Sequence, residues 1–74
     1  MENLKKQIQL AVDAFKSGRL LEAEDLARKL IDSNPSVVFL YNLLGLILVE
    51  LKDIDQALKY YEKGIKIDSN FAEI

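Results

Sequence analysis

Apolar residues recur at every third or fourth position along most of this chain, which is the spacing of one face of an α-helix. Between residues 20 and 31 the apolar positions are Leu20, Ala23, Leu26, Ala27, Leu30 and Ile31. This spacing argues against β-strands and predicts four helical segments, near residues 4–17, 19–33, 36–51 and 54–67. The chain is therefore expected to have an all-α fold.

A repeat of 34 residues organises the sequence. When the chain is shifted by this period, similar residues coincide, and the pairs are Leu10 with Leu44, Ala11 with Gly45, Leu20 with Ile54 and Ala23 with Ala57. Each unit contains two helical segments joined by a turn, as in helical repeats. The sequence predicts one domain, residues 1–74, of tandem antiparallel helix hairpins. The first repeat is expected at about 4–37, the second at about 38–71, and the start of a third up to residue 74.

Turn and capping residues lie at the expected helix ends. Gly18 follows the first segment, where a left-handed conformation that glycine adopts freely is common. Asn34 and Pro35 are predicted to be the cap and the first-turn proline of the third helix. Asp53 and Gln56 have the spacing of a capping box at the start of the fourth helix.

Seven positions in each unit follow one pattern. In the second unit they are Tyr41, Leu44, Gly45, Leu48, Ala57, Tyr61 and Ser69, and in the first unit Gln7, Leu10, Ala11, Ala14, Ala23, Ala27 and Pro35. This spacing resembles the tetratricopeptide repeat, whose pattern is W-x2-L-G-x2-Y, then A-x3-F, then P. The resemblance covers nearly the whole chain. It implies that small residues, Gly45 and Ala57 in the second repeat, lie where two helices cross.

The sequence departs from the family pattern at three places. Gln7 stands where the family prefers a large aromatic residue, so the first repeat is expected to pack like a terminal, cap-like unit. Lys52 replaces the turn glycine of the first repeat, which has a cost if positive φ is needed. Ser69 replaces the closing proline. Asn70 and Glu73 repeat the capping-box spacing, which predicts a fifth helix beginning there.

The resemblance also implies a binding surface, because in this family the first helices of successive repeats line a concave groove. Carried onto this sequence, the candidate protein-binding residues are Ile8, Val12, Phe15, Phe39, Asn42, Leu43, Leu46 and Val49. Nearly all are apolar, whereas a typical groove of this family is polar. The second helices form the convex back and are expected to be solvated, with the i,i+4 ion pairs Glu24–Arg28, Asp25–Lys29, Asp55–Lys59 and Glu62–Lys66.

The segment at 36–51 carries more apolar surface than two repeats can cover. Its stripe of Phe39, Leu43, Leu46 and Val49 is additional to the stripes expected to face neighbouring helices. Two explanations remain open. Either a downstream third repeat or another segment of the same chain covers the stripe as ordinary core, or the stripe is an interface for a second copy or another protein. We expect a homodimer through these four residues.

Composition excludes several classes of function. The chain of 74 residues has neither histidine nor cysteine and a net charge of −2. The commonest general base, thiol nucleophile and metal ligands are absent, so we expect no enzyme activity and no cofactor. An acidic chain is not expected to bind nucleic acid or an anionic membrane. The N-terminus does not resemble a secretory signal and the longest apolar run is too short to span a bilayer, so a cytoplasmic domain is predicted.

Three interpretations of function follow from the sequence. The first is a protein–protein interaction scaffold whose apolar groove associates with itself or with an apolar or amphipathic helix. The second is an N-terminal arm that positions substrate for a larger enzyme, such as the glycosyl- or sulfotransferase-like proteins that carry similar repeats. The third is a designed or excised fragment of repeat protein. The residues that follow in the parent gene would separate the second interpretation from the first.

Overall fold

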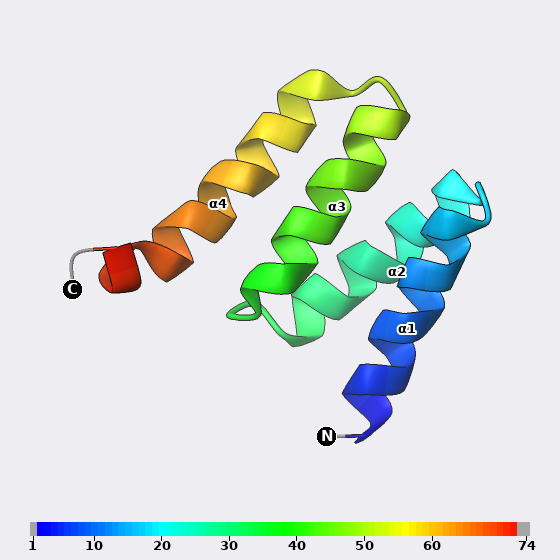
Figure 1. Ribbon diagram of the computed structural model, residues 1–74, viewed down its shortest axis with the longest axis horizontal. Coiled ribbons are helices and arrows are strands. Elements are labelled where there is room, and N and C mark those ends of the chain that lie inside the picture. The colour runs from blue at the N-terminus through cyan, green and yellow to red at the C-terminus, as the bar shows by residue number, and fades with distance from the viewer. Residues whose placement is uncertain (1, 73–74) are drawn as a thin grey trace.

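The computed structural model describes residues 2–72, and within them the chain forms two helix hairpins (Figure 1). The helices are α1 (Glu2–Lys16), α2 (Leu20–Ser33), α3 (Val38–Glu50) and α4 (Ile54–Ala72). α1 packs against α2 and α3 against α4, while α2 also packs against α3, so that α3 has a neighbour on each side. The predicted all-α fold of antiparallel hairpins is confirmed.

The first helix of each hairpin ends in the same backbone motif. Gly18 has a φ of 82° and Lys52 a φ of 71°, both in the left-handed region. After each of them, the next N–H donates to a carbonyl five residues earlier: Arg19 to Ala14 and Asp53 to Leu48. This is the Schellman motif, which satisfies carbonyls at a helix end. Lys52 therefore occupies a glycine position, as the repeat alignment predicts.

The connection between α2 and α3 differs from the prediction. Asn34 caps the end of α2 instead of the start of α3, because its side-chain amide donates to the Leu30 carbonyl at 3.0 Å. α3 begins later, after Val37, which makes no side-chain capping bond. Pro35 lies in the turn, and its carbonyl accepts a 2.6 Å hydrogen bond from the Tyr41 hydroxyl. The Asn34 side chain thus bonds a carbonyl at the end of α2 and not the N–H groups at the start of α3.

Asp53 caps the start of α4 as predicted, but the reciprocal half of the capping box is absent, because the Asp53 backbone N–H donates to the Leu48 carbonyl. The backbone N–H of Gln56 donates to Asp53 Oδ1 at 3.3 Å, and the Gln56 side-chain amide donates to Oδ2 at 2.9 Å. Asp53 thus accepts hydrogen bonds from one backbone and one side-chain donor in the first turn, where a carboxylate also complements the helix dipole.

The predicted fifth helix is wrong within the described residues. α4 continues without a break through Asn70 to Ala72, whereas Glu73 lies outside the described residues. The physical reason is that Ser69 stands where the repeat pattern has proline, and no residue between Ile65 and Ala72 is a proline or a glycine. Nothing in this sequence therefore forces the helix to end.

The core lies between the four helices and is built from small residues against large ones. Its buried members are Ala11, Ala14, Ala23, Ala27, Leu30, Leu40, Leu43, Leu44, Ile47, Leu48 and Ala57. The alanines allow helix backbones to approach closely, and α3 supplies most of the large side chains. As predicted, Gly45 lies at a helix crossing, where the ring of Tyr61 fills the space that a β-carbon would need.

A polar network on Arg28 links α2 to α4, whose described Cα atoms stay more than 8 Å apart. The guanidinium of Arg28 donates to Glu24 at 2.9 Å on its own helix, and to Gln56 at 2.9 Å and the Tyr60 hydroxyl at 3.0 Å on α4. Burial opposes the charge, but the hydrogen bonds to Glu24 and Tyr60 and the electrostatic effect of these two groups outweigh it and raise the pKa of Arg28 above its ordinary value. A single long side chain thus connects the second helices of the two repeats.

The ion pairs predicted on α2 are present. Arg28 lies 2.8 Å from Glu24, and Lys29 lies 3.0 Å from Asp25. The second pair is well exposed, so it contributes little to stability and mainly keeps this side of α2 solvated.

Candidate functional site

Three of the predicted binding residues are large apolar side chains exposed on α3. Phe39 is 51% exposed, Leu46 49% and Val49 37%. Together with the exposed Asn42, they lie three or four residues apart and so form one stripe along the helix. The sequence predicts this stripe as additional to those that face neighbouring helices. The remaining leucine, isoleucine and tyrosine residues of α3 are indeed buried.

The other predicted residues lie elsewhere. Leu43 is only 4% exposed and belongs to the core, so its placement on the binding surface is corrected. Leu43 lies three residues after Leu40 and four before Ile47, so it shares one side of α3 with these two buried residues. Three more candidates on α1 are half-buried and pack against the same core: Ile8, Val12 and Phe15.

A second apolar stripe on α4 was not part of the predicted site. Ile54 is 49% exposed, Leu58 56% and Ile65 67%. Together with the half-buried Tyr61, they are spaced four, three and four residues apart. That spacing is present in the sequence. The stripe was not predicted because the i,i+4 ion pairs expected on α4 indicated a solvated helix.

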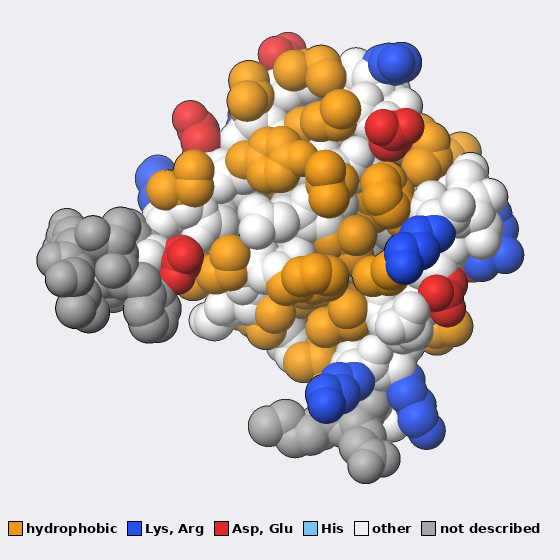
Figure 2. Space-filling view, viewed as in Figure 1, with side chains coloured by type: hydrophobic (Ala, Val, Ile, Leu, Met, Phe, Trp, Pro, Cys, Tyr) orange, Lys and Arg blue, Asp and Glu red, His pale blue; other side chains and the backbone are white. Residues whose placement is uncertain are grey.

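The two stripes lie on the same side of the second hairpin. Tyr61 reaches from α4 over Gly45 of α3 and so stands between them. Figure 2 shows a field of hydrophobic side chains that extends over α3 and α4 on the viewed side. We call this surface the α3–α4 face, and its exposed members are Phe39, Leu46, Val49, Ile54, Leu58 and Ile65.

The first repeat shows what such a face does when it is occupied. Val12, Phe15 and Ile31 lie 34 residues before Leu46, Val49 and Ile65, and all three are half-buried against the core. α3 packs on this side of the first hairpin, against α2 and, more lightly, α1. At these three positions the α3–α4 face corresponds to the surface on which α3 packs, whereas Phe39 and Leu58 correspond to the charged Lys5 and Glu24. None of the helices in residues 2–72 packs on the α3–α4 face.

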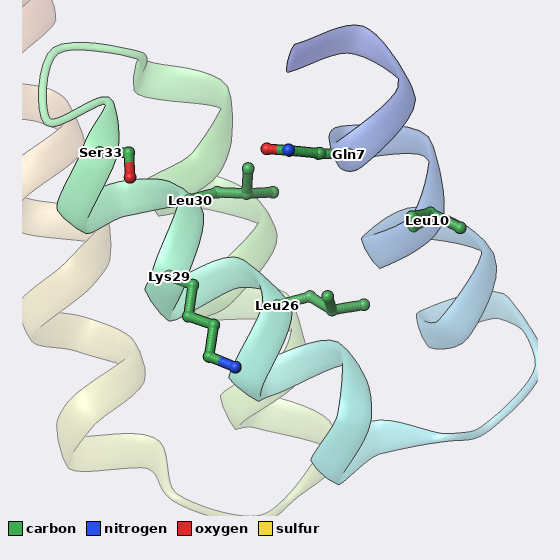
Figure 3. A pocket seen from close by; sticks show the side chains of 6 residues that line it. All are labelled: Gln7, Leu10, Leu26, Lys29, Leu30 and Ser33. Atoms are coloured by element: carbon green, nitrogen blue, oxygen red, sulfur yellow. The ribbon is translucent and has the colours of Figure 1, made fainter. Parts of the chain in front are cut away.

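A hollow lies at the opposite end of the molecule, between α1 and α2. It has a volume of about 360 Å³ and is lined by Gln7, Leu10, Leu26, Lys29, Leu30 and Ser33 (Figure 3). Gln7 points from α1 toward Leu30 on α2. The ammonium of Lys29 is paired with Asp25, and the remaining lining groups are neutral. The hollow thus has no set of converging charged groups.

A profile of the tetratricopeptide repeat matches residues 38–71. This range contains α3 and most of α4, and with them the contact of Gly45 with Tyr61. The chain belongs to the tetratricopeptide-repeat family. Repeats of this family commonly serve as scaffolds for protein–protein interaction.

One curated relative of this tetratricopeptide-repeat chain is a UDP-N-acetylglucosamine–peptide N-acetylglucosaminyltransferase of Caenorhabditis elegans. The two are 32% identical over 72 residues, which is 97% of this chain but 6% of the relative. The chain therefore spans a small part of the relative's length. A search of solved structures gave no significant match.

The described residues offer an apolar surface for contact with another molecule. Residues 2–72 contain no group of three or more acidic side chains placed to hold a metal ion. No helix in that range is long and apolar enough to cross a membrane. The α3–α4 face has no hydrogen-bond donor among its six exposed apolar members, so its contacts with another molecule would be chiefly hydrophobic.

Proposed function

We propose that the chain is a protein-interaction scaffold and that its α3–α4 face binds an α-helix of a protein partner. One observation carries the proposal: six large apolar side chains are exposed together on one side of a single hairpin. Apolar patches of this kind are uncommon on isolated domains and mark interaction surfaces. The segment is proposed to bind and not to catalyse.

A helix suits this face better than an extended peptide. The apolar side chains follow two neighbouring helices, and a third helix with anchors three and four residues apart can lie along them. α3 itself lies on the corresponding surface of the first hairpin in this manner. Full burial of a large apolar side chain contributes roughly 1.5–3 kcal/mol, and these are about half exposed, so six together can exceed the several kcal/mol that association costs.

Self-association is a second form of the same function. Phe39, Leu46 and Val49, which the sequence predicts at a dimer interface, are exposed and available to a second copy. A two-fold dimer would place this face against itself. The molar mass of the free chain, measured over a hundredfold range of concentration, distinguishes a homodimer from a monomer that needs a partner.

The relative supports a further candidate, a substrate-positioning arm of a larger glycosyltransferase. The sequence predicts this alternative, and the relative is a glycosyltransferase that transfers N-acetylglucosamine to peptides. In that case the α3–α4 face would contact protein substrate or another part of the enzyme. The coding sequence on both sides of this segment in its gene decides whether a transferase domain accompanies it.

Helix binding is tested with a designed peptide. The peptide carries leucines at the spacing of Leu40, Leu43, Leu44, Ile47 and Leu51, with equal numbers of lysine and glutamate elsewhere. We expect saturable binding by fluorescence anisotropy. Leu46→Glu should abolish binding, because a charge would be buried at the contact. Leu10→Glu is the control, since Leu10 is 57% exposed but lies on the other end of the molecule. Equal binding by both variants would contradict the proposal.

A further inference from the structure

The α3–α4 face has an acidic border. On α4, Asp55 and Glu62 each lie three or four residues from Leu58, and Asp68 lies three residues after Ile65, so these carboxylates are surface neighbours of the apolar stripe. On α3, Glu50 lies four residues after Leu46 in the same way and is the helix's single charged residue. All four carboxylate residues are exposed. Figure 2 shows several acidic side chains around the hydrophobic field over these helices, with basic side chains among them at its margin.

The lysines of α4 lie farther from the apolar stripe. Lys59 and Lys66 are three or four residues from acidic residues and not from Leu58 or Ile65. Lys63 points elsewhere, with its ammonium 4.8 Å from the centre of the Tyr60 ring. Exposed i,i+4 pairs are weak, so a cation from another molecule can still gain from the carboxylates next to the stripe.

The first repeat carries no such border. The residues at the four equivalent positions, 34 residues earlier, are Lys16, Leu21, Arg28 and Asn34. These four positions of the first repeat thus hold two basic, one apolar and one neutral polar residue, and the basic Arg28 is paired there with Glu24. One repeat later these four positions are all acidic, and the positions of Lys5 and Glu24 are taken by the apolar Phe39 and Leu58. The second surface is therefore more apolar than the first and more acidic at these edge positions.

We infer that the partner of the α3–α4 face is a basic amphipathic helix, an inference that rests on the proposed function. Its apolar side should follow the spacing by which α3 packs on the first hairpin, with buried residues such as Leu40, Leu43 and Ile47. Its flanks carry lysine or arginine, which meet the carboxylates of Glu50 and Glu62 at the edge of the contact. Complementary charge at such a rim contributes mainly to partner choice and association rate.

A second copy of this chain fits the face less well. In a head-to-tail arrangement α1 would take the place that α3 has on the first hairpin. The α1 residues 34 positions before Leu40, Leu43, Leu44 and Ile47 are Lys6, Gln9, Leu10 and Asp13, and only one of them is apolar. In a face-to-face dimer the acidic borders would oppose one another. Like charges at an interface disfavour a partner.

Two peptides test the charge of the partner. Both carry leucines at the α3 spacing, and the remaining positions are lysine and alanine in one, glutamate and alanine in the other. At low salt the lysine peptide should bind on the order of tenfold more tightly, since four weak rim contacts add to the shared apolar contact. In 1 M salt, where the Debye length is about 3 Å, the two affinities should converge.

Variants of the chain show whether the charges act from this face. Leu58→Glu should abolish binding of the lysine peptide, whereas Leu10→Glu should not change it, although the two leucines are 56% and 57% exposed. The double variant Asp55→Lys, Glu62→Lys should reverse the preference toward the glutamate peptide. These positions are exposed, and circular dichroism confirms that each variant is folded.

Each other outcome has a definite meaning. If both peptides bind equally to the unaltered chain at low salt, the inference is overturned while the proposed helix binding stands. If neither peptide binds, both are overturned. If the free chain is already a dimer at the concentrations used, and the lysine peptide does not displace the second copy, the face belongs to a homodimer and the inference fails.

Discussion

Tyr61 of α4 lies so close over Gly45 of α3 that a β-carbon at position 45 would be 2.6 Å from Tyr61 Cε1. The glycine is therefore required by the ring across the helix crossing and not by its own backbone, which is helical. The ring stands between the two apolar stripes of the α3–α4 face. The packing of the hairpin and the continuity of the candidate binding surface thus depend on the same contact.

Substitution of Gly45 should destabilise the fold. Gly45→Ala gains helix propensity of up to about 1 kcal/mol, but it forces the Tyr61 ring to move and should cost roughly 1–3 kcal/mol by overpacking. Gly45→Leu should cost more. Thermal or urea unfolding followed by circular dichroism gives the difference. An increase in the midpoint for Gly45→Ala would mean that the contact with Tyr61 is not tight in solution.

Gly64→Ala is the matched control on α4. A β-carbon at position 64 would lie 3.4 Å from the Tyr41 β-carbon and 3.5 Å from Asn42 Oδ1, which are ordinary contacts. The helix-propensity gain should then dominate, and the variant should be more stable by about 0.5–1 kcal/mol. If Gly45→Ala lowers the stability and Gly64→Ala raises it, the effect of the close helix crossing is separated from the effect of helix propensity.

Much of the fold could be predicted from the sequence, because the repeat period fixes equivalent positions. Gly18 and Lys52, which the alignment places at the same turn, both have positive φ. The end of α4 could not be predicted in the same way. The capping spacing of Asn70 with Glu73 favours a break, but capping residues stabilise a helix start without forcing the preceding helix to stop.

The candidate site was predicted in part. Phe39 and Leu46 were found because α3 is too apolar to be covered on all sides by one hairpin neighbour and α2. Leu58 and Ile65 were missed because i,i+4 charge pairs mark α4 as solvated, and a helix can present such pairs on one side and an apolar stripe on another. Leu43 was misplaced because it lies only about 40° around the helix from Phe39, yet Phe39 is exposed and Leu43 is buried.

Lys52→Gly should stabilise the chain. A non-glycine residue in the left-handed region costs roughly 1 kcal/mol, and glycine removes that cost at the C-terminal motif of α3. Gly18→Ala should have the opposite effect for the same reason. Both shifts are read from unfolding midpoints. If Lys52→Gly were less stable than the unaltered chain, a contact of the lysine side chain would have to outweigh its backbone strain.

Replacement of Arg28 should weaken the link between the repeats. Arg28→Met retains much of the side-chain volume but loses the hydrogen bonds to Gln56 and Tyr60, and partly exposed bonds of this kind contribute about 0.5–1.5 kcal/mol each. Because the pKa of Arg28 is raised, its contribution is present at all lower pH and is lost only in strong alkali, so the effect should be the same at pH 6 and pH 8. Lys29→Met, in an exposed ion pair, should change stability little.

Acidic peptides that mimic the C-terminal tails of heat-shock chaperones should not bind. Family members that bind such tails use Lys, Asn and Arg in the groove to hold the terminal carboxylate, and here Ile8, Val12 and Leu43 occupy three of those positions. None of these side chains can donate a hydrogen bond, and Leu43 is buried. Calorimetry with such a peptide measures this directly, with the lysine peptide as the positive control. Micromolar affinity for the acidic tail would contradict the prediction.

Salt should affect self-association and helix binding in opposite directions. When two copies bring their α3–α4 faces together, apolar contacts between residues such as Leu46 and Leu58 favour the dimer, but the carboxylates of Glu50 and Glu62 are brought near like charges. Salt screens that repulsion, so the dimer should strengthen as ionic strength rises from about 0.01 M to 1 M. The complex with the lysine peptide should weaken over the same range.

Melting temperature and molar mass report both effects. Assembly stabilises the folded state by mass action, so the melting temperature of the unaltered chain should depend on protein concentration more in high salt than in low salt. Leu46→Glu should remove the concentration dependence at any ionic strength, and Leu10→Glu should retain it. A dimer that is strongest at low salt would show that attractive charges hold the copies together. The acidic border would then not face its own counterpart, and another pairing, such as the lysines of α1 against this border, would have to be the interface.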